Sequence, residues 1–212
     1  MELSNVISQL NWRAATKSFD PDKKITAGDL EQLLEVLRLT PSSYGLQPWK
    51  FVIVKDLETR KKLKTASYDQ PQVVEASDFI VFCAKTSLAQ SDVDYYIKTT
   101  AEVRGISEEV LEDFKKLLSG FVSNKNTSDL VVWGAKQTYV ALGNLLTACA
   151  LVNIDACPME GFDLVQYNEI LGLKDLGLTA TVACAIGYRG PNDKSAETKK
   201  VRFPKEEVVI EK

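Results

Sequence analysis

The sequence contains no histidine among its 212 residues, and this absence removes several classes of catalytic site. Without an imidazole there is no Ser-His-Asp or Cys-His nucleophile pair, no HExxH zinc site and no histidine proton shuttle. A metal site would need all four cysteines, and their spacing contains no CxxC. We therefore expect no metal, and we expect the chemistry to be carried by other side chains or by a bound cofactor.

Cysteine is scarce, and its placement favours a structural role. Cys83, Cys149 and Cys184 lie in the apolar stretches IVFCAKT, LLTACALV and TVACAIG, which is typical of small buried side chains. The N-terminal stretch MELSNVISQLNW has neither the basic region nor the apolar run of a signal peptide. These features predict a reducing, cytoplasmic environment.

An excess of positive charge and a long apolar run are also missing. Lys and Arg number 26 against 29 Asp and Glu, which argues against general nucleic-acid binding. The uncharged stretch from Gln137 to Ile154 is interrupted by polar residues, so we expect no membrane span. Neither GxGxxG nor GxxxxGK[ST] occurs, so there is no Rossmann fingerprint and no P-loop.

The hydrophobic pattern predicts alternating helices and strands, and hence mixed α and β layers. Thr26, with Asp29 three residues later, is typical of a helix start, and Ser107 can cap another helix. The remaining helices are expected over 1–11, 57–67 and 129–152. Strands are expected over 49–54, 78–84, 178–188 and 207–211. The helix over 129–152 is apolar on all sides, which indicates a core or a subunit interface.

Two short basic patches and two loops could bind a ligand. The patches, WRAATKSFDP and TKKVRFP, hold Arg and Lys residues that suit a phosphate, although such runs are also common on solvated surfaces. The loop PSSYGLQPW can present serine hydroxyls and backbone amides, or it can be an ordinary helix-to-strand turn. In CPMEGFD, Gly161 allows a backbone amide to approach a planar ligand closely.

Taken in order, these segments resemble the FMN-dependent nitroreductase family, of the oxygen-insensitive NAD(P)H nitroreductase and dihydropteridine reductase type. The resemblance covers nearly the whole chain. It is carried by RAATKSFDPDKKIT, PSSYGLQPWKFVIV, ASDFIVFCAKT, WGAKQTYVALGNLL, DACPMEGFD, IGYR and KKVRFP.

The resemblance implies an α+β sandwich with a central, mostly antiparallel sheet flanked by helices. Residues 1–212 would form a single FMN-binding domain. It further implies an intertwined homodimer, in which the terminal strand EVVIE joins the partner's sheet and two FMN sites lie between the subunits.

The resemblance also implies which residues contact the cofactor. By position they are Arg13, Ala14, Ala15, Lys17, Pro41, Ser42, Ser43, Asp69, Gln137, Pro158, Met159, Glu160, Gly161, Lys200 and Arg202. Lys17 is the residue expected to act in catalysis, through its charge near the flavin N1–C2 oxygen edge, and Arg104 and Gln72 are assigned to the substrate side. Six positions carry residues other than those usual in the family: Ala14, Ala15, Gly45, Leu46, Asp69 and Gln72.

The implied activity is hydride transfer from NADH or NADPH through FMN to a nitroaromatic or quinone-type acceptor, by a ping-pong mechanism without a side-chain nucleophile. Small molecules are then the expected substrates, with neither nucleic acid nor membrane as partner. A dihydropteridine, flavin or enal reductase of the same family is an alternative, and so is a flavin-binding protein without turnover. The sequence does not distinguish NADH from NADPH.

Overall fold

A four-stranded antiparallel sheet lies at the centre of the computed structural model, which describes residues 2–212. The strands lie in the order β1-β2-β4-β3. Their bounds are β1 (Trp49–Ile53), β2 (Asp78–Lys85), β3 (Asp155–Met159) and β4 (Leu178–Gly187). Residues Phe79 to Ala84 of β2 are 0% exposed, because helices cover both faces of the sheet.

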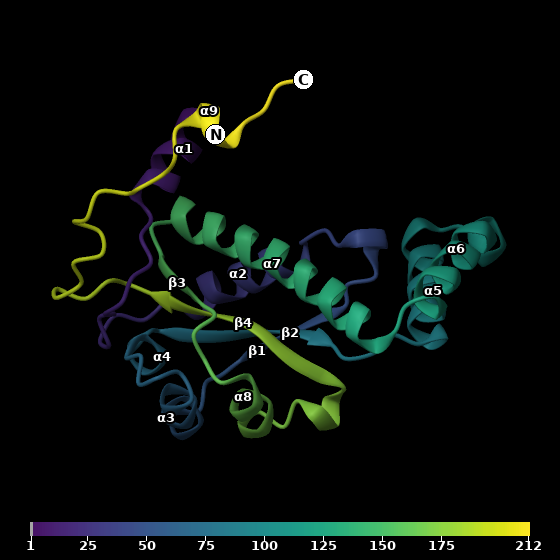
Figure 1. Ribbon diagram of the computed structural model, residues 1–212, viewed down its shortest axis with the longest axis horizontal. Coiled ribbons are helices and arrows are strands. Elements are labelled where there is room, and N and C mark those ends of the chain that lie inside the picture. Colours follow the sequence, from purple (N-terminus) through teal and green to yellow (C-terminus); the bar gives the residue numbers. More distant parts are fainter. Residues whose placement is uncertain (1) are drawn as a thin grey trace.

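The helices form two layers around this sheet (Figure 1). The helices α2 (Ala27–Arg38) and α7 (Thr127–Leu151) pack on one face, where Leu37, Phe82 and Leu145 are fully buried. On the other face lie α3 (Leu57–Thr65), α4 (Gln72–Glu75) and α8 (Leu164–Ile170), around Leu63, Phe79 and Tyr167. The expected sandwich of an antiparallel sheet and flanking helices is therefore confirmed.

A helical lobe extends to one side of the sandwich (right in Figure 1). It consists of α5 (Gln90–Arg104), the 3₁₀ turn η2 (Glu108–Leu111) and α6 (Glu112–Ser123). Val93, Ile97 and Leu118 form its own apolar core, so the lobe does not depend on the sheet for burial. Ser107 occupies the N-cap position, but a 3₁₀ turn follows it rather than the helix that was expected directly.

Most predicted elements are present within a few residues of their expected bounds. The hydroxyl of Thr26 accepts a hydrogen bond from the Asp29 amide at 3.1 Å and caps α2. The N-terminal helix is α1 (Leu3–Trp12); Met1, which the prediction included, lies outside the described residues. The remaining short turns are η1 (Ser43–Gly45) and η3 (Lys174–Leu176).

The strand β3 was not anticipated, because CPMEGFD was interpreted as a loop. Cys157, Pro158 and Met159 instead pair with Ala185, Cys184 and Ala183 of β4. Pro158 is tolerated because β3 lies at the edge of the sheet, where a missing amide interrupts no ladder.

The predicted terminal strand over Glu207–Glu211 is not formed in this chain. The short helix α9 (Lys205–Val208) replaces its first half, and the last residues follow without regular structure. Figure 1 shows this segment leading away from the body beside α1. A strand needs a partner edge for its backbone groups, and within residues 2–212 this segment meets none.

The long helix α7 is only partly covered. Its inner face, with Gly134, Thr138 and Leu142, lies against the sheet and α2. Its outer face exposes Val132, Tyr139 and Val140. The all-round apolar pattern therefore corresponds to one packed and one open side. Among the described residues, no helix combines the length and the apolar character needed to cross a bilayer.

Candidate functional site

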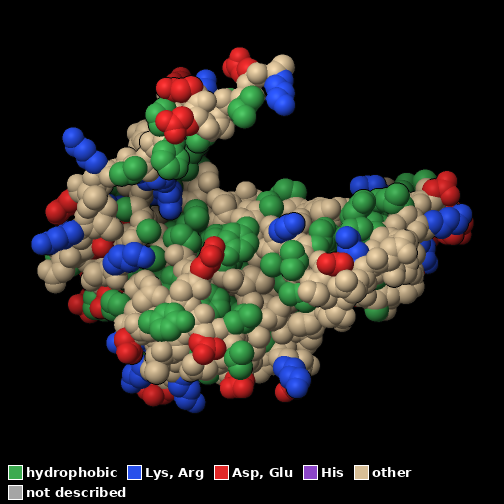
Figure 2. Space-filling view, viewed as in Figure 1, with side chains coloured by type: hydrophobic (Ala, Val, Ile, Leu, Met, Phe, Trp, Pro, Cys, Tyr) green, Lys and Arg blue, Asp and Glu red, His purple; other side chains and the backbone are tan. Residues whose placement is uncertain are grey.

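Four cationic side chains from opposite ends of the chain line one cavity of about 280 Å³: Arg13, Lys199, Lys200 and Arg202. Arg13 follows α1, whereas Lys200 and Arg202 belong to the extended segment after β4. The predicted contact residues Ala14 and Ala15 line the same cavity. Figure 2 shows several blue side chains below the arm that α1 and the C-terminal segment form. The two basic patches of the sequence thus form one site.

The positive charges in this cavity are not balanced by acidic groups. Lys200 Nζ donates to the backbone carbonyl oxygen of Arg13 at 2.5 Å, and within residues 2–212 none of the four cations pairs with a carboxylate. Partial burial lowers the pKa of Lys200, and the charges of Arg13 and Arg202 lower it further. A bound anion would relieve this repulsion.

A buried ion pair holds the segment that carries Arg13. Asp155, at the start of β3, accepts hydrogen bonds from Arg189 Nε at 2.8 Å and from Thr16 Oγ1 at 3.3 Å. The Arg189 guanidinium also covers the Trp12 ring, 4.5 Å from its centroid. The residues before and after Arg13 are therefore fixed to the sheet.

Lys17 and Gln72 meet at a buried thiol. The exposed Lys17 side chain places Nζ 3.5 Å from Cys157 Sγ, and Gln72 Nε2 lies 3.8 Å from the same sulfur. Gln72 also donates to Gln70 Oε1 at 2.8 Å, and Gln70 Nε2 donates to the carbonyl oxygen of Gly161 at 2.8 Å. The structure thus links Lys17, on the N-terminal segment, to the segment that follows β3.

The other residues predicted near this edge lie in the same region, with one difference. Asp69 is exposed on a turn next to Gln70, where its φ of 59° is in the left-handed region. Pro158, Glu160 and Gly161 are at least partly exposed at the end of β3. Met159, in contrast, is buried in the core, so its side chain does not face the site.

The loop Pro41–Ser43 and Gln137 form a second group. The backbone amide of Ser43 donates to Gln137 Oε1 at 2.8 Å, and Ser42 Oγ accepts from the Gln47 amide at 2.9 Å. Figure 1 shows this loop (dark blue, between α2 and β1) well apart from the C-terminal segment that carries Lys200. Within one chain, the predicted cofactor residues therefore fall into two separate groups.

Some predicted residues lie elsewhere, and some neighbours of the site were not predicted. Arg104 is the exposed last residue of α5, in the helical lobe and away from the cation cavity (Figure 1). Tyr139, interpreted from the sequence as part of an apolar stripe, lies near Glu160 at the end of β3. Partial burial raises the pKa of Tyr139 to about 12, and the nearby Glu160 carboxylate contributes to this shift. For Cys157, the sequence indicated only a small buried apolar side chain and no contact with the site.

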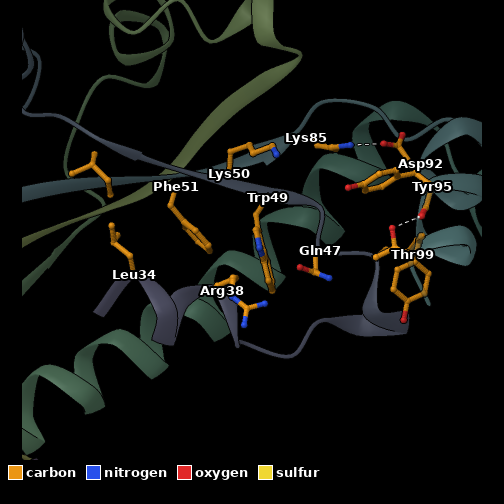
Figure 3. A pocket seen from close by; sticks show the side chains of 13 residues that line it. Leu34, Arg38, Gln47, Trp49, Lys50, Phe51, Lys85, Asp92, Tyr95 and Thr99 are labelled. Atoms are coloured by element: carbon orange, nitrogen blue, oxygen red, sulfur yellow. Dashed lines mark hydrogen bonds and ion pairs between the residues drawn. The ribbon is translucent and has the colours of Figure 1, made fainter. Parts of the chain in front are cut away.

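A larger cavity of about 520 Å³ lies between α2, the edge strand β1 and α5 (Figure 3). Trp49, Phe51 and Leu34 contribute its apolar wall, and Lys85 forms an ion pair with Asp92 at the α5 side. Leu46, Gln47 and Trp49 of the loop PSSYGLQPW line it, but none of the predicted catalytic, cofactor-contact or substrate residues does. Size alone therefore does not identify the site, whereas the convergence of cations does.

Comparison with known proteins gives a consistent result. Residues 10–188 match the model of the nitroreductase family. A Staphylococcus haemolyticus protein provisionally named an NAD(P)H nitroreductase is 38% identical, with 96% of this chain and 95% of that protein covered. A Bacillus subtilis protein with the same provisional name is also 38% identical, covering 88% of this chain and 89% of its own length.

Solved structures show the same fold at lower sequence identity. A Bacillus subtilis nitroreductase-like structure has a TM-score of 0.88 at 22% identity and covers all of both chains. An Exiguobacterium sibiricum nitroreductase-like structure, solved in complex with FMN, has a TM-score of 0.82 at 22% identity and covers 100% of this chain and 98% of its own. With the family model and the relatives above, this chain belongs to the nitroreductase family of FMN-using oxidoreductases.

Proposed function

We propose that this protein binds FMN and transfers hydride from NADH or NADPH to nitroaromatic or quinone-type acceptors, with ping-pong kinetics. Residues 1–212 are proposed to act as a single FMN-binding domain of a cytoplasmic homodimer. The observation that carries the proposal is the convergence of Arg13, Lys200 and Arg202 on one cavity, beside the segment that leads to Lys17.

The cation cavity fits a phosphate group. A phosphate monoester carries close to two negative charges at neutral pH, and arginine offers paired donors to its oxygens. The four cations supply the balancing charge; partial burial lowers the pKa of Lys200, and the charges of Arg13 and Arg202 lower it further. We therefore assign the FMN phosphate to Arg13, Lys200 and Arg202.

Lys17 is proposed to stabilise the reduced cofactor. Bound FMN supplies hydride acceptance at N5, with negative charge gained at its N1–C2 oxygen edge. A fixed ammonium at that edge favours the charge, as preorganised cations generally do in active sites. Gln72 is uncharged, so Lys17 is the main cation there, while Asp69 can accept a hydrogen bond from the flavin N3–H. The end of β3, with Glu160 and Gly161, provides the backbone beside the ring.

A homodimer would bring the two residue groups together. The loop Pro41–Ser43 and Gln137 are separated from the cation cavity within one chain, so a partner can supply them to a shared site. The outer face of α7 and the unpaired edge of β1 offer apolar and backbone contacts for such a partner. We propose that the C-terminal residues 207–211 pair with the partner's sheet. Light scattering should report a dimer for the full chain, and a chain ending at Lys205 should dissociate more readily.

An acceptor panel tests the activity. Purified, FMN-loaded protein is mixed with NADH or NADPH and then with nitrofurazone, menadione, a pterin, free flavin or an enal. We expect bleaching of the bound flavin, reoxidation by nitrofurazone or menadione, and parallel lines in double-reciprocal plots. Flavin that stays oxidised with both nicotinamides would contradict the proposal and favour a binding protein without turnover.

A further inference from the structure

We propose that Cys157 and Gln72 are positioning residues for Lys17: the Cys157 sulfur accepts a hydrogen bond that fixes the Lys17 ammonium at the flavin edge without neutralising its charge, and Gln72 holds that sulfur in place. The inference rests on the proposed function, since it concerns how this chain prepares its own cation for FMN. It adds to that function a role for the buried thiol of Cys157. From the hydrophobic pattern alone, Cys157 would be interpreted only as a core residue.

The contacts form a continuous chain from Lys17 to the end of β3. Lys17 Nζ donates to Cys157 Sγ at 3.5 Å, and Gln72 Nε2 lies 3.8 Å from that sulfur. Gln72 reaches Gln70 at 2.8 Å, and Gln70 reaches the carbonyl oxygen of Gly161 at the same distance. Both elements proposed to face the flavin ring are therefore held by one network.

Burial gives this network its rigidity. Cys157 is 0% exposed and Gln72 is 1% exposed, whereas the Lys17 side chain is exposed. A lysine side chain is a flexible four-carbon stem, so an exposed ammonium samples many positions unless something fixes its end. A sulfur anchored in β3 provides such a fixed acceptor.

The acceptor is also uncharged, which preserves the charge of Lys17. Burial raises the pKa of the Cys157 thiol, and this effect outweighs the opposing influence of Lys17 and Gln72, so the thiol stays protonated at neutral pH. The Asp193 carboxylate bonds to the Lys17 backbone rather than to its ammonium: the Lys17 amide donates to Asp193 Oδ1 at 3.1 Å. Within residues 2–212, Lys17 forms no ion pair. A carboxylate in place of the thiol would also hold the Lys17 ammonium, but its negative charge would cancel the positive potential of Lys17 at the flavin edge.

The test compares the affinities of the protein for reduced and oxidised FMN. Flavin fluorescence titration gives the dissociation constant of oxidised FMN, and dye equilibration gives the midpoint potential, from which the ratio of affinities follows. Cys157→Ala should lower this ratio about tenfold, which corresponds to a midpoint potential about 30 mV more negative. Cys157→Ser keeps an acceptor and should restore most of the ratio. Cys184→Ser is the matched control, because Cys184 is equally buried on β4 but faces the opposite layer.

The outcomes separate the inference from the proposed function. If wild-type protein binds no FMN, the proposed function fails. If it binds FMN and Cys157→Ala has the wild-type potential, the inference is overturned while the function stands. Should Cys157→Ala not yield folded protein, Gln72→Met removes the amide and keeps the length. The ratio should then fall severalfold, and an unchanged ratio overturns the inference.

Discussion

Lys200 and Arg13 are 187 positions apart in the sequence, yet the Lys200 ammonium donates to the Arg13 carbonyl oxygen at 2.5 Å. The contact closes the cation cavity between the N-terminal and C-terminal segments. The N-terminal segment contributes Arg13 and the C-terminal segment contributes Lys199, Lys200 and Arg202, so the full charge of the cavity requires both segments. The integrity of this cavity therefore depends on the polar segment after β4 remaining ordered against α1.

Arg202→Ala should weaken FMN binding. Hydrogen bonds to charged groups contribute about 1.5–3 kcal/mol, so loss of one arginine predicts at least a roughly tenfold rise in the dissociation constant. Flavin fluorescence titration measures the change. Lys205→Ala removes a nearby exposed cation outside the cavity and should leave binding unaffected. A variant that keeps its yellow cofactor through extended dialysis would refute the assignment of Arg202.

Lys17→Ala should slow flavin reduction more than it weakens FMN binding. The charge of Lys17 matters most when the cofactor becomes negative, so we expect roughly a tenfold slower reduction by NAD(P)H. Anaerobic stopped-flow absorbance measures the rate. Lys24→Ala, which removes an exposed lysine at the start of the segment before α2, serves as the control. Reduction at the wild-type rate would show that Lys17 has no such role.

Asp155→Ala should destabilise the fold. The change leaves Arg189 without its acceptor and removes the hydrogen bond to Thr16, and breaking a buried ion pair costs about 3–5 kcal/mol. Because Arg189 is 26% exposed, we expect the lower end of that range. Urea denaturation followed by tryptophan fluorescence measures the loss. Glu31→Ala, on the exposed side of α2, should change stability little, and an equal loss in both variants would contradict the role of the pair.

Asp193→Asn should reduce stability at neutral pH and flatten its dependence on acid. Burial alone would raise the pKa of Asp193, but hydrogen bonds from the Ser195 hydroxyl and the Lys17 amide outweigh it and lower the pKa below its usual value. A lowered carboxyl pKa stabilises the fold above the unfolded-state value, and this contribution is lost as pH falls through the folded-state value.

The difference in unfolding free energy between wild type and Asp193→Asn should therefore be constant from pH 7 to about pH 5 and shrink below about pH 4. Urea denaturation at a series of pH values measures it. A difference that stays the same down to pH 3 would show that Asp193 does not carry this part of the acid sensitivity.

The sequence by itself determined most of the local structure. Leu30, Leu33 and Leu37 recur at helical spacing, and α2 buries all three. The apolar runs around Phe82 and Ala183 correctly predicted the central strands β2 and β4, because a strand that is buried on both faces needs a continuous apolar run. The order of the motifs also identified the family and its cofactor, since that information is carried by residue identity.

Only the tertiary structure decided which residues meet. In the sequence, Cys157 is indistinguishable from other small apolar residues. In the fold, the β3–β4 register places its sulfur beside Lys17 and Gln72. The terminal EVVIE segment has strand-forming residues, but a strand forms only where an edge accepts its hydrogen bonds, and within residues 2–212 this segment pairs with no edge. Periodicity is a local property of the chain, whereas a binding site depends on long-range contacts that sheet register and helix packing create.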